Sequence, residues 1–208
     1  MPLRKQSHAA EIHEVVARTY PRDADGLIRQ LDDADPEVRR RAARDLADSA
    51  GSTSALGARL TVETDRSVQM VLLSSLRAQP TAGTVEVLLG LLRSEDTALR
   101  NDCIDALAAM PDLVGPHIDT LLGDVDSDVR IFTINLLGDL RHVHVNAWLV
   151  RVLEHEHHVN VVAAAIEVLA EVGGPAELPA LEAVRARFAH DDFIQFVANV
   201  AIERSQPS

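Results

Sequence analysis

Apolar residues recur along this chain with the spacing of a helix. Between positions 124 and 140, Val129 is followed by leucines seven, eight and eleven residues later. This spacing is typical of an amphipathic helix with one buried side. A shorter apolar run, HIDTLL at 117–122, comes directly before it. The stretch from 117 to 140 therefore predicts two consecutive helices.

The same pair of segments returns about every thirty residues. We align the repeats on one apolar residue, called the register position. Its members are Val38, Val68, Leu99, Val129, Val161 and Phe193. A second apolar position follows eight residues later, with Leu46, Leu76, Leu107, Leu137, Leu169 and Ala201. A period of this length is typical of stacked structural repeats and not of a single globular core.

Turn-forming residues separate the repeats. AQPTAGT at 78–84 and EVGGPAELP at 171–179 contain Pro and Gly, which interrupt helices. No linker between repeats is long enough to separate two domains. Before the first repeat, HAAEIHEVVARTY at 8–20 predicts a helix that covers the apolar end of the array. We therefore divide the chain into an N-terminal capping segment, 1–24, and a repeat array, 25–204.

An aspartate stands three residues before the register position in four repeats. These residues are Asp35, Asp65, Asp96 and Asp126. We interpret them as N-caps, because an aspartate carboxylate accepts hydrogen bonds from the unpaired amides of a first helical turn. The negative charge also favours the positive end of the helix dipole, and each cap contributes roughly 0.5 to 2 kcal/mol.

A basic or polar residue follows the register position in the same repeats. These residues are Arg39, Gln69, Arg100 and Arg130. We expect the arginines to pair with an aspartate of their own or of an adjacent unit, forming a ladder along the stack. In the last two repeats His158 and His190 replace the aspartate, and Val162 and Ile194 replace the arginine. Because both members disappear together, we interpret the pair as structural.

The stretch DPEVRRRAARDL at 35–46 follows the pattern D-x-x-V-R-x-x-A-x-x-x-L. In this it resembles the HEAT-like repeat proteins, in particular the short bacterial form named after phycobilisome lyases. The resemblance covers residues 25–172 well and the sixth repeat loosely. It implies an all-α fold, a right-handed α-solenoid of about six two-helix repeats whose second helices line a concave face. Scaffolds, bilin lyases, hydroxylases and DNA glycosylases share this repeat, so the resemblance specifies fold and not function.

Composition and charge narrow the choice of partners. The chain is 47% apolar but only 3% aromatic, which favours a core of Leu, Val and Ala between packed helices. A formal net charge of -12 disfavours nucleic acid and anionic membranes as partners. No apolar segment has the length of a membrane span, so we expect a cytoplasmic protein. A single cysteine, Cys103, excludes an intramolecular disulfide.

Function is expected where the repeats differ, on the outward side of the second helices. We select the positions two and six residues after the register position. They hold Arg40, Arg44, Met70, Ser74, Asn101, Asp105, Ile131, Asn135 and Glu167. The later position changes from basic through neutral to acidic along the chain. We therefore expect a non-catalytic adaptor or scaffold, without a cofactor, that binds another protein on the concave face. The alternative is a solvated surface with no role.

The residues or the resemblance also suggest three other functions. RRRAAR at 39–44 could contact phosphates, but the other repeats do not continue the basic cluster. His155, His157, His158 and His190 could bind a transition metal, although exposed turn histidines that replace a cap explain them as well. Bilin lyase activity or chromophore handling follows from the resemblance alone, since no separate chemistry in the residues indicates it.

Overall fold

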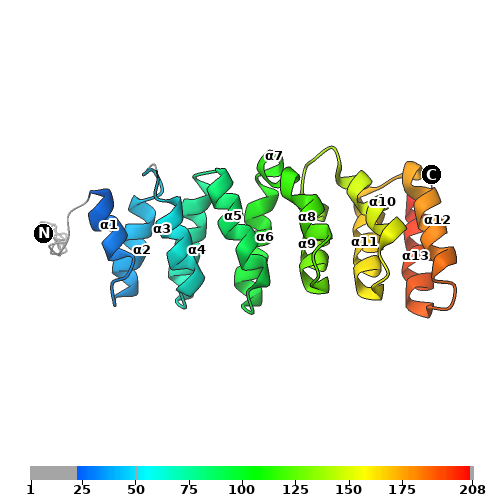
Figure 1. Ribbon diagram of the computed structural model, residues 1–208, viewed down its shortest axis with the longest axis horizontal. Helices are drawn as coiled ribbons and strands as arrows, with labels where there is room; N and C mark the ends of the chain where they lie inside the picture. Colours follow the sequence, from blue (N-terminus) through cyan, green and yellow to red (C-terminus); the bar gives the residue numbers. More distant parts are fainter. Residues whose placement is uncertain (1–22, 50, 207–208) are drawn as a thin grey trace, which may run out of the picture.

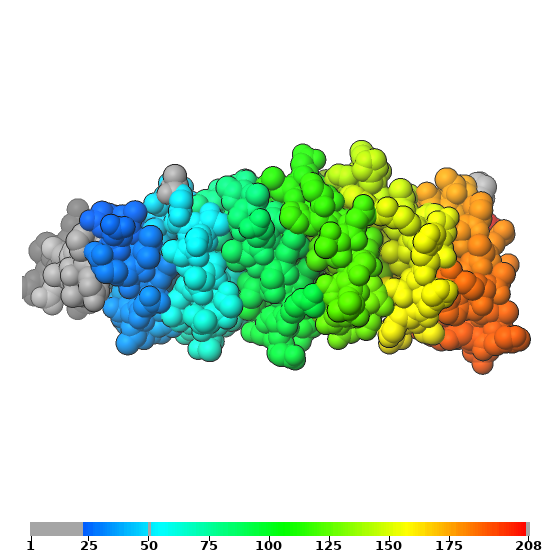
Figure 2. Space-filling view, in the orientation of Figure 1, coloured from blue at the N-terminus to red at the C-terminus, as the bar shows by residue number. Residues whose placement is uncertain are grey.

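The computed structural model describes residues 23–49 and 51–206, and every regular element in these ranges is helical. The helices form pairs that follow one another in a single row (Figure 1). Figure 2 shows the row as an elongated body with its units in chain order. The predicted solenoid of helix pairs is confirmed. The helix predicted at 8–20 and nearly all of the capping segment 1–24 lie outside the described residues.

Each unit contributes one helix, or one set of short helices, to each of two layers. The first layer contains α1 (Ala24–Gln30), α3 (Thr53–Val62), α5 (Ala82–Gly90) with η1 (Leu91–Arg93), α7 (Pro111–Val114) with η2 (Gly115–His117) and α8 (Ile118–Leu122), α10 (Val145–His155), and η3 (Pro175–Glu177) with α12 (Leu178–Arg187). The second layer contains α2 (Pro36–Asp45), α4 (Arg66–Arg77), α6 (Thr97–Ala108), α9 (Ser127–Asp139), α11 (Val159–Val172) and α13 (Asp192–Ser205).

Aliphatic side chains fill the space between the two layers. The leucines predicted eight residues after the register position, from Leu46 to Leu169, are completely buried. Cys103 belongs to the same core, and burial together with the nearby charge of Asp102 raises the pKa of its thiol to about 12. The core is therefore continuous along the row and contains no reactive thiolate.

The four predicted N-caps are confirmed. Asp35 accepts a hydrogen bond from the amide of Glu37 at 2.9 Å, and Asp126 accepts one from the amide of Asp128 at 2.9 Å. Asp65 and Asp96 each accept from two amides of the first turn. The cap residues have extended backbone angles, so each ends its turn and starts the second helix of its unit.

The sixth unit departs from the predicted alignment by one residue. Asp191, not His190, caps α13, and it accepts a hydrogen bond from the amide of Ile194 at 2.9 Å. Ile194 is completely buried while Phe193 is 50% exposed, so Ile194 holds the register position. Gln195 then follows it, as Gln69 follows Val68. The prediction that this unit lacks both members of the pair was wrong, because its turn is one residue longer than we assumed.

The arginines that follow the register position do not pair with the capping aspartates. Arg39 instead donates to the backbone carbonyls of Asp33 and Ala34 in its own turn and to the carboxylate of Glu63 in the next unit. Arg130 repeats this arrangement with Glu156 of the following unit, at 2.8 Å. The predicted ladder therefore exists in part, with a different acceptor.

That acceptor belongs to a set of residues that stand two positions before each cap. These turn acceptors are Asp33, Glu63, Ser94, Asp124 and Glu156. Each accepts a hydrogen bond from the amide of the cap residue, at distances from 2.8 to 3.2 Å. The repeated acidic pairs in the turns, such as Asp124 and Asp126, thus close the turn and cap the helix respectively.

Candidate functional site

The second helices of neighbouring units lie against each other and form one surface, the second-helix face. Arg66 of α4 forms an ion pair with Asp102 of α6. Further along, the guanidinium of Arg100 in α6 lies 4.1 Å from the centre of the Phe132 ring in α9. Because these contacts join successive units directly, side chains at equivalent positions of different units lie on one continuous surface.

Most of the predicted site residues are exposed on this face. Arg44, Met70, Ser74, Asn101, Asp105, Asn135 and Glu167 are exposed, and Arg40 and Ile131 are half-buried. In the fifth unit the earlier position is Ala163, which is only 4% exposed and is enclosed in the stack. The later position is therefore open to solvent in the first five units, whereas exposure at the earlier position varies from Met70 to the buried Ala163.

A groove between α4 and α6 brings three of the predicted residues together. It has a volume of about 260 Å³ and is lined by Met70, Leu73, Ser74, Arg77, Asp102 and Asp105. Met70, with half of its surface exposed, supplies an apolar wall on the α4 side. The α6 side supplies two carboxylates. The groove thus offers an apolar surface beside acidic groups and one exposed arginine.

Leu73, Arg77 and Asp102 were not among the predicted residues. They line the groove because the positions two, five, six and nine after the register in α4 face the positions three and six in α6. The two predicted positions lie on one side of a single helix, whereas the groove is formed by two helices. The offset between neighbouring helices follows from how the units stack, which the sequence pattern did not show.

With Ile194 as its register residue, the sixth unit also has a residue at each of the two predicted positions. Counted from Ile194, the positions two and six residues later in α13 hold Phe196 and Val200, which are 66% and 40% exposed. Asp191 was the available signal, because it stands three residues before Ile194 as the other caps stand before their register residues.

The basic cluster at 39–44 is largely paired within the protein. Arg39 is bound to Glu63, and both Arg40 and Arg41 form ion pairs with Glu37. An arginine whose charge is already balanced gains less by contacting a phosphate. Arg39, Arg40 and Arg41 thus already have carboxylate partners within the protein, although Glu37 serves two of them and Arg44 is exposed.

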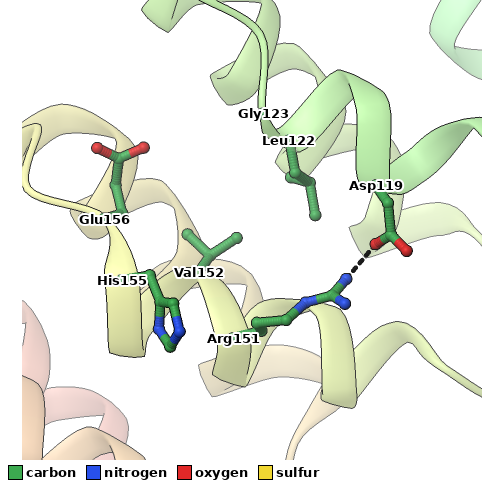
Figure 3. A pocket seen from close by; sticks show the side chains of 7 residues that line it. All are labelled: Asp119, Leu122, Gly123, Arg151, Val152, His155 and Glu156. Atoms are coloured by element: carbon green, nitrogen blue, oxygen red, sulfur yellow. Dashed lines mark hydrogen bonds and ion pairs between the residues drawn. The ribbon is translucent and has the colours of Figure 1, made fainter.

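A second hollow lies in the first layer, between α8 and α10. Its volume is about 400 Å³, and Figure 3 shows Arg151 reaching across it to form an ion pair with Asp119. His155 lines this hollow, pointing away from the carboxylate of Glu156 (Figure 3). Both side chains of that ion pair are exposed, so the pair contributes little to holding the two helices together.

The histidines at the end of α10 are not arranged around a shared centre. Burial would raise the pKa of Glu156, but hydrogen bonds from the amides of His158 and His157 and from Arg130 lower it. This carboxylate is thus already engaged by the turn. Within residues 23–49 and 51–206, no three or more His, Cys, Asp or Glu side chains gather where they could hold a metal ion.

No helix in the described part of the chain combines the length and the apolar character needed to cross a membrane.

Comparisons with known proteins agree with the repeat architecture. A family model described as HEAT repeats matches residues 24–108 and 116–203. No curated protein matches the sequence. Among solved structures, an engineered protein is similar, with 24% identity and a TM-score of 0.41 over 88% of this chain and 96% of that one.

Two natural structures show the same kind of similarity. The complex of CpcE and CpcF of phycocyanin lyase from Nostoc sp. PCC7120 has 21% identity and a TM-score of 0.38, over 87% of this chain and 82% of that one. The archaeal HEAT-like repeats protein from Thermococcus onnurineus NA1 has 16% identity and a TM-score of 0.44, over 87% and 86%. Since the family model spans both halves of the row, this chain belongs to the HEAT repeat family.

Proposed function

We propose that this protein is a non-catalytic adaptor that binds another protein along its second-helix face. The groove between α4 and α6 is the observation that carries the proposal. Its walls are helices fixed by the continuous core, so its shape is set before a partner arrives. A pre-ordered surface lowers the entropic cost of binding, and repeat folds present such surfaces in extended form.

The side chains of the groove indicate what kind of segment it would hold. Met70 offers a flexible apolar surface, which adapts to apolar side chains of different shapes. Asp105 on the opposite wall favours a basic residue beside that apolar side chain, whereas Asp102 is already paired with Arg66. Arg77 at the rim favours a carboxylate further along the segment. The groove therefore suits a partner segment with an apolar anchor flanked by charges of both signs.

The proposal is tested by capture from native lysate with the wild type and the double variant Arg44→Glu, Asp105→Arg. Captured proteins are identified by mass spectrometry, and affinity is then measured with the purified partner. We expect the double variant to raise the Kd by about tenfold or more. Because both residues are exposed, its melting temperature should equal that of the wild type.

A matched control uses Glu86→Arg, which changes an exposed charge in the first layer on α5. This variant should bind the partner as the wild type does. Equal affinity of the double variant and the wild type would exclude the second-helix face as the binding surface. Recovery of a bilin or a nucleic acid in place of a protein would contradict the adaptor role itself.

A further inference from the structure

Helix α13 carries an exposed apolar stripe at the end of the row, where Figure 1 places the last helix pair. Phe193 is 50% exposed, Phe196 is 66% exposed and Val200 is 40% exposed. These residues are separated by three and four positions, so they lie on one side of the helix. Exposing two phenylalanine rings to solvent is unfavourable, and the chain has only 3% aromatic residues.

Helix α13 lacks the aliphatic side chain that the other second helices use to contact the next repeat. Five residues after the register position, α4, α6, α9 and α11 have buried aliphatic side chains. These are Leu73, Ile104, Ile134 and Ile166. The equivalent residue in α13 is Asn199, which is exposed and accepts a hydrogen bond from Arg185 at 2.9 Å. A further unit stacked in the same way would bury this amide, which costs free energy without a new partner.

Charged residues continue the stripe at both ends. Asp192, Phe196, Val200 and Arg204 are spaced by four, so they form one ridge along the helix surface. Asp192 and Arg204 are exposed, and in the described part of the chain neither forms an ion pair. Along the helix, the ridge therefore presents an acidic, an aromatic, an aliphatic and a basic side chain, in that order.

This order is complementary to itself when two helices run antiparallel. With a two-fold axis at the level of residue 198, Phe196 of one copy lies at the level of Val200 of the other. Asp192 then lies at the level of Arg204 of the other copy, at each end of a contact about 18 Å long. A parallel arrangement would instead bring like charges together.

We propose that α13 is the dimerisation surface of this protein and that the partner is a second copy of the chain, bound antiparallel about a two-fold axis. Such an isologous contact uses the same patch on both copies. It covers the stripe without burying a further repeat unit on it. Helices α4 and α6, which form the groove, lie nearer the other end of the row (Figure 1), so the dimer would present two grooves for partner segments.

The first test measures self-association of the full chain by sedimentation equilibrium. We expect a dimer for the wild type at concentrations up to about 100 μM. Phe196→Glu should raise the dimer Kd by roughly 100-fold, because it places two carboxylates in the apolar centre of the contact. The matched control is Val143→Glu, at a residue 90% exposed in another turn, and it should leave the Kd unchanged.

The second test exchanges charges and depends on the antiparallel pairing. Asp192→Arg and Arg204→Asp should each raise the dimer Kd roughly tenfold. In the homodimer of either variant, residues 192 and 204 of opposite copies carry the same charge at both ends of the contact. A mixture of these two variants should form heterodimers, since every pair between them is again of opposite sign. A chain that carries both substitutions should dimerise as the wild type does.

Three results would overturn the proposal. These are a wild type that stays monomeric throughout the concentration range, a Phe196→Glu variant that dimerises normally, and single charge variants that fail to associate with each other when mixed. The double variant Arg44→Glu, Asp105→Arg should dimerise normally, so loss of partner capture and loss of the dimer are measured by separate variants.

Discussion

Glu63 joins the first two units through hydrogen bonds to both of them. Its fully buried carboxylate forms ion pairs with Arg39 of α2 at 2.8 Å and with Arg59 of α3 at 2.9 Å. It also accepts from the amide of Asp65 at 2.8 Å. Burial alone would raise the pKa of Glu63, but the hydrogen bonds from Arg39, the Asp65 amide and Arg59 lower it to about 2. The charged form is therefore the one that the folded protein stabilises.

The depressed pKa of Glu63 predicts how stability depends on pH. The folded value of about 2 lies below the ordinary value of 4.5, so the contribution is present above pH 4.5 and is lost as the pH falls toward 2. It amounts to about 3 kcal/mol. Glu63→Gln should lose it at every pH, because the variant leaves Arg39 buried without a counter-charge.

Urea denaturation of the two proteins between pH 7 and pH 3 measures this difference. The wild type should lose more free energy of unfolding over this range than Glu63→Gln does. Glu86→Gln, at an exposed residue of α5, serves as the control and should follow the wild type. Parallel curves for the wild type and Glu63→Gln would contradict the assignment.

Among the second-layer helices, α11 begins with an unusual cap. His158 has backbone angles of φ -76° and ψ 114°, close to the φ -82° and ψ 117° of Asp126, yet its side chain makes no capping hydrogen bond. The turn acceptor Glu156 still holds the amide of His158 at 2.8 Å. The turn is therefore shaped for an aspartate that this unit does not have.

Restoring that aspartate should stabilise the protein. We expect His158→Asp to raise the free energy of unfolding by about 1 kcal/mol, because the new carboxylate can accept from the first-turn amides of α11. Asp126→Ala is the complementary change and should lower it by a similar amount. Thermal unfolding at neutral pH compares the two variants. A destabilised His158→Asp variant would show that repulsion from Glu156 exceeds the gain from the cap.

The caps also show how far the sequence pattern could predict these elements. Aspartates at a fixed distance from the register position located the starts of four second helices, because capping is a local interaction. The same local pattern also holds at α13, where Asp191 stands three residues before Ile194, but the assumed spacing between repeats placed the register position one residue too early, at Phe193. The groove could not be predicted in full, since Leu73 and Asp102 meet only through the offset between neighbouring helices.

At the scale of the whole molecule, close contact between units depends on small residues at particular places. A Cβ added at Gly57 of α3 would lie 2.5 Å from Val87 Cγ2 and 2.9 Å from Val87 Cγ1 in α5. Both methyl groups obstruct it, and a valine has little freedom to rotate away. Gly57 therefore allows α3 and α5 to approach as the stack requires. A Cβ added at Gly90 meets no atom within 4 Å.

Substitutions at these two glycines should have opposite effects on stability. Gly57→Ala forces α3 and α5 apart and should cost about 1 to 3 kcal/mol. Gly90→Ala removes only the flexibility of the unfolded chain and should stabilise by roughly 0.5 to 1 kcal/mol. Because each unit contacts mainly its neighbours, the damage in Gly57→Ala should stay local.

Hydrogen exchange followed by mass spectrometry locates that damage. In Gly57→Ala we expect the amides of α3, α4 and α5 to lose protection while those of α11 and α13 keep it, since the far units retain all of their own contacts. Gly90→Ala should match the wild type throughout. Equal loss of protection in every helix would show that the row unfolds as one cooperative body and that contacts between neighbouring units do not act independently.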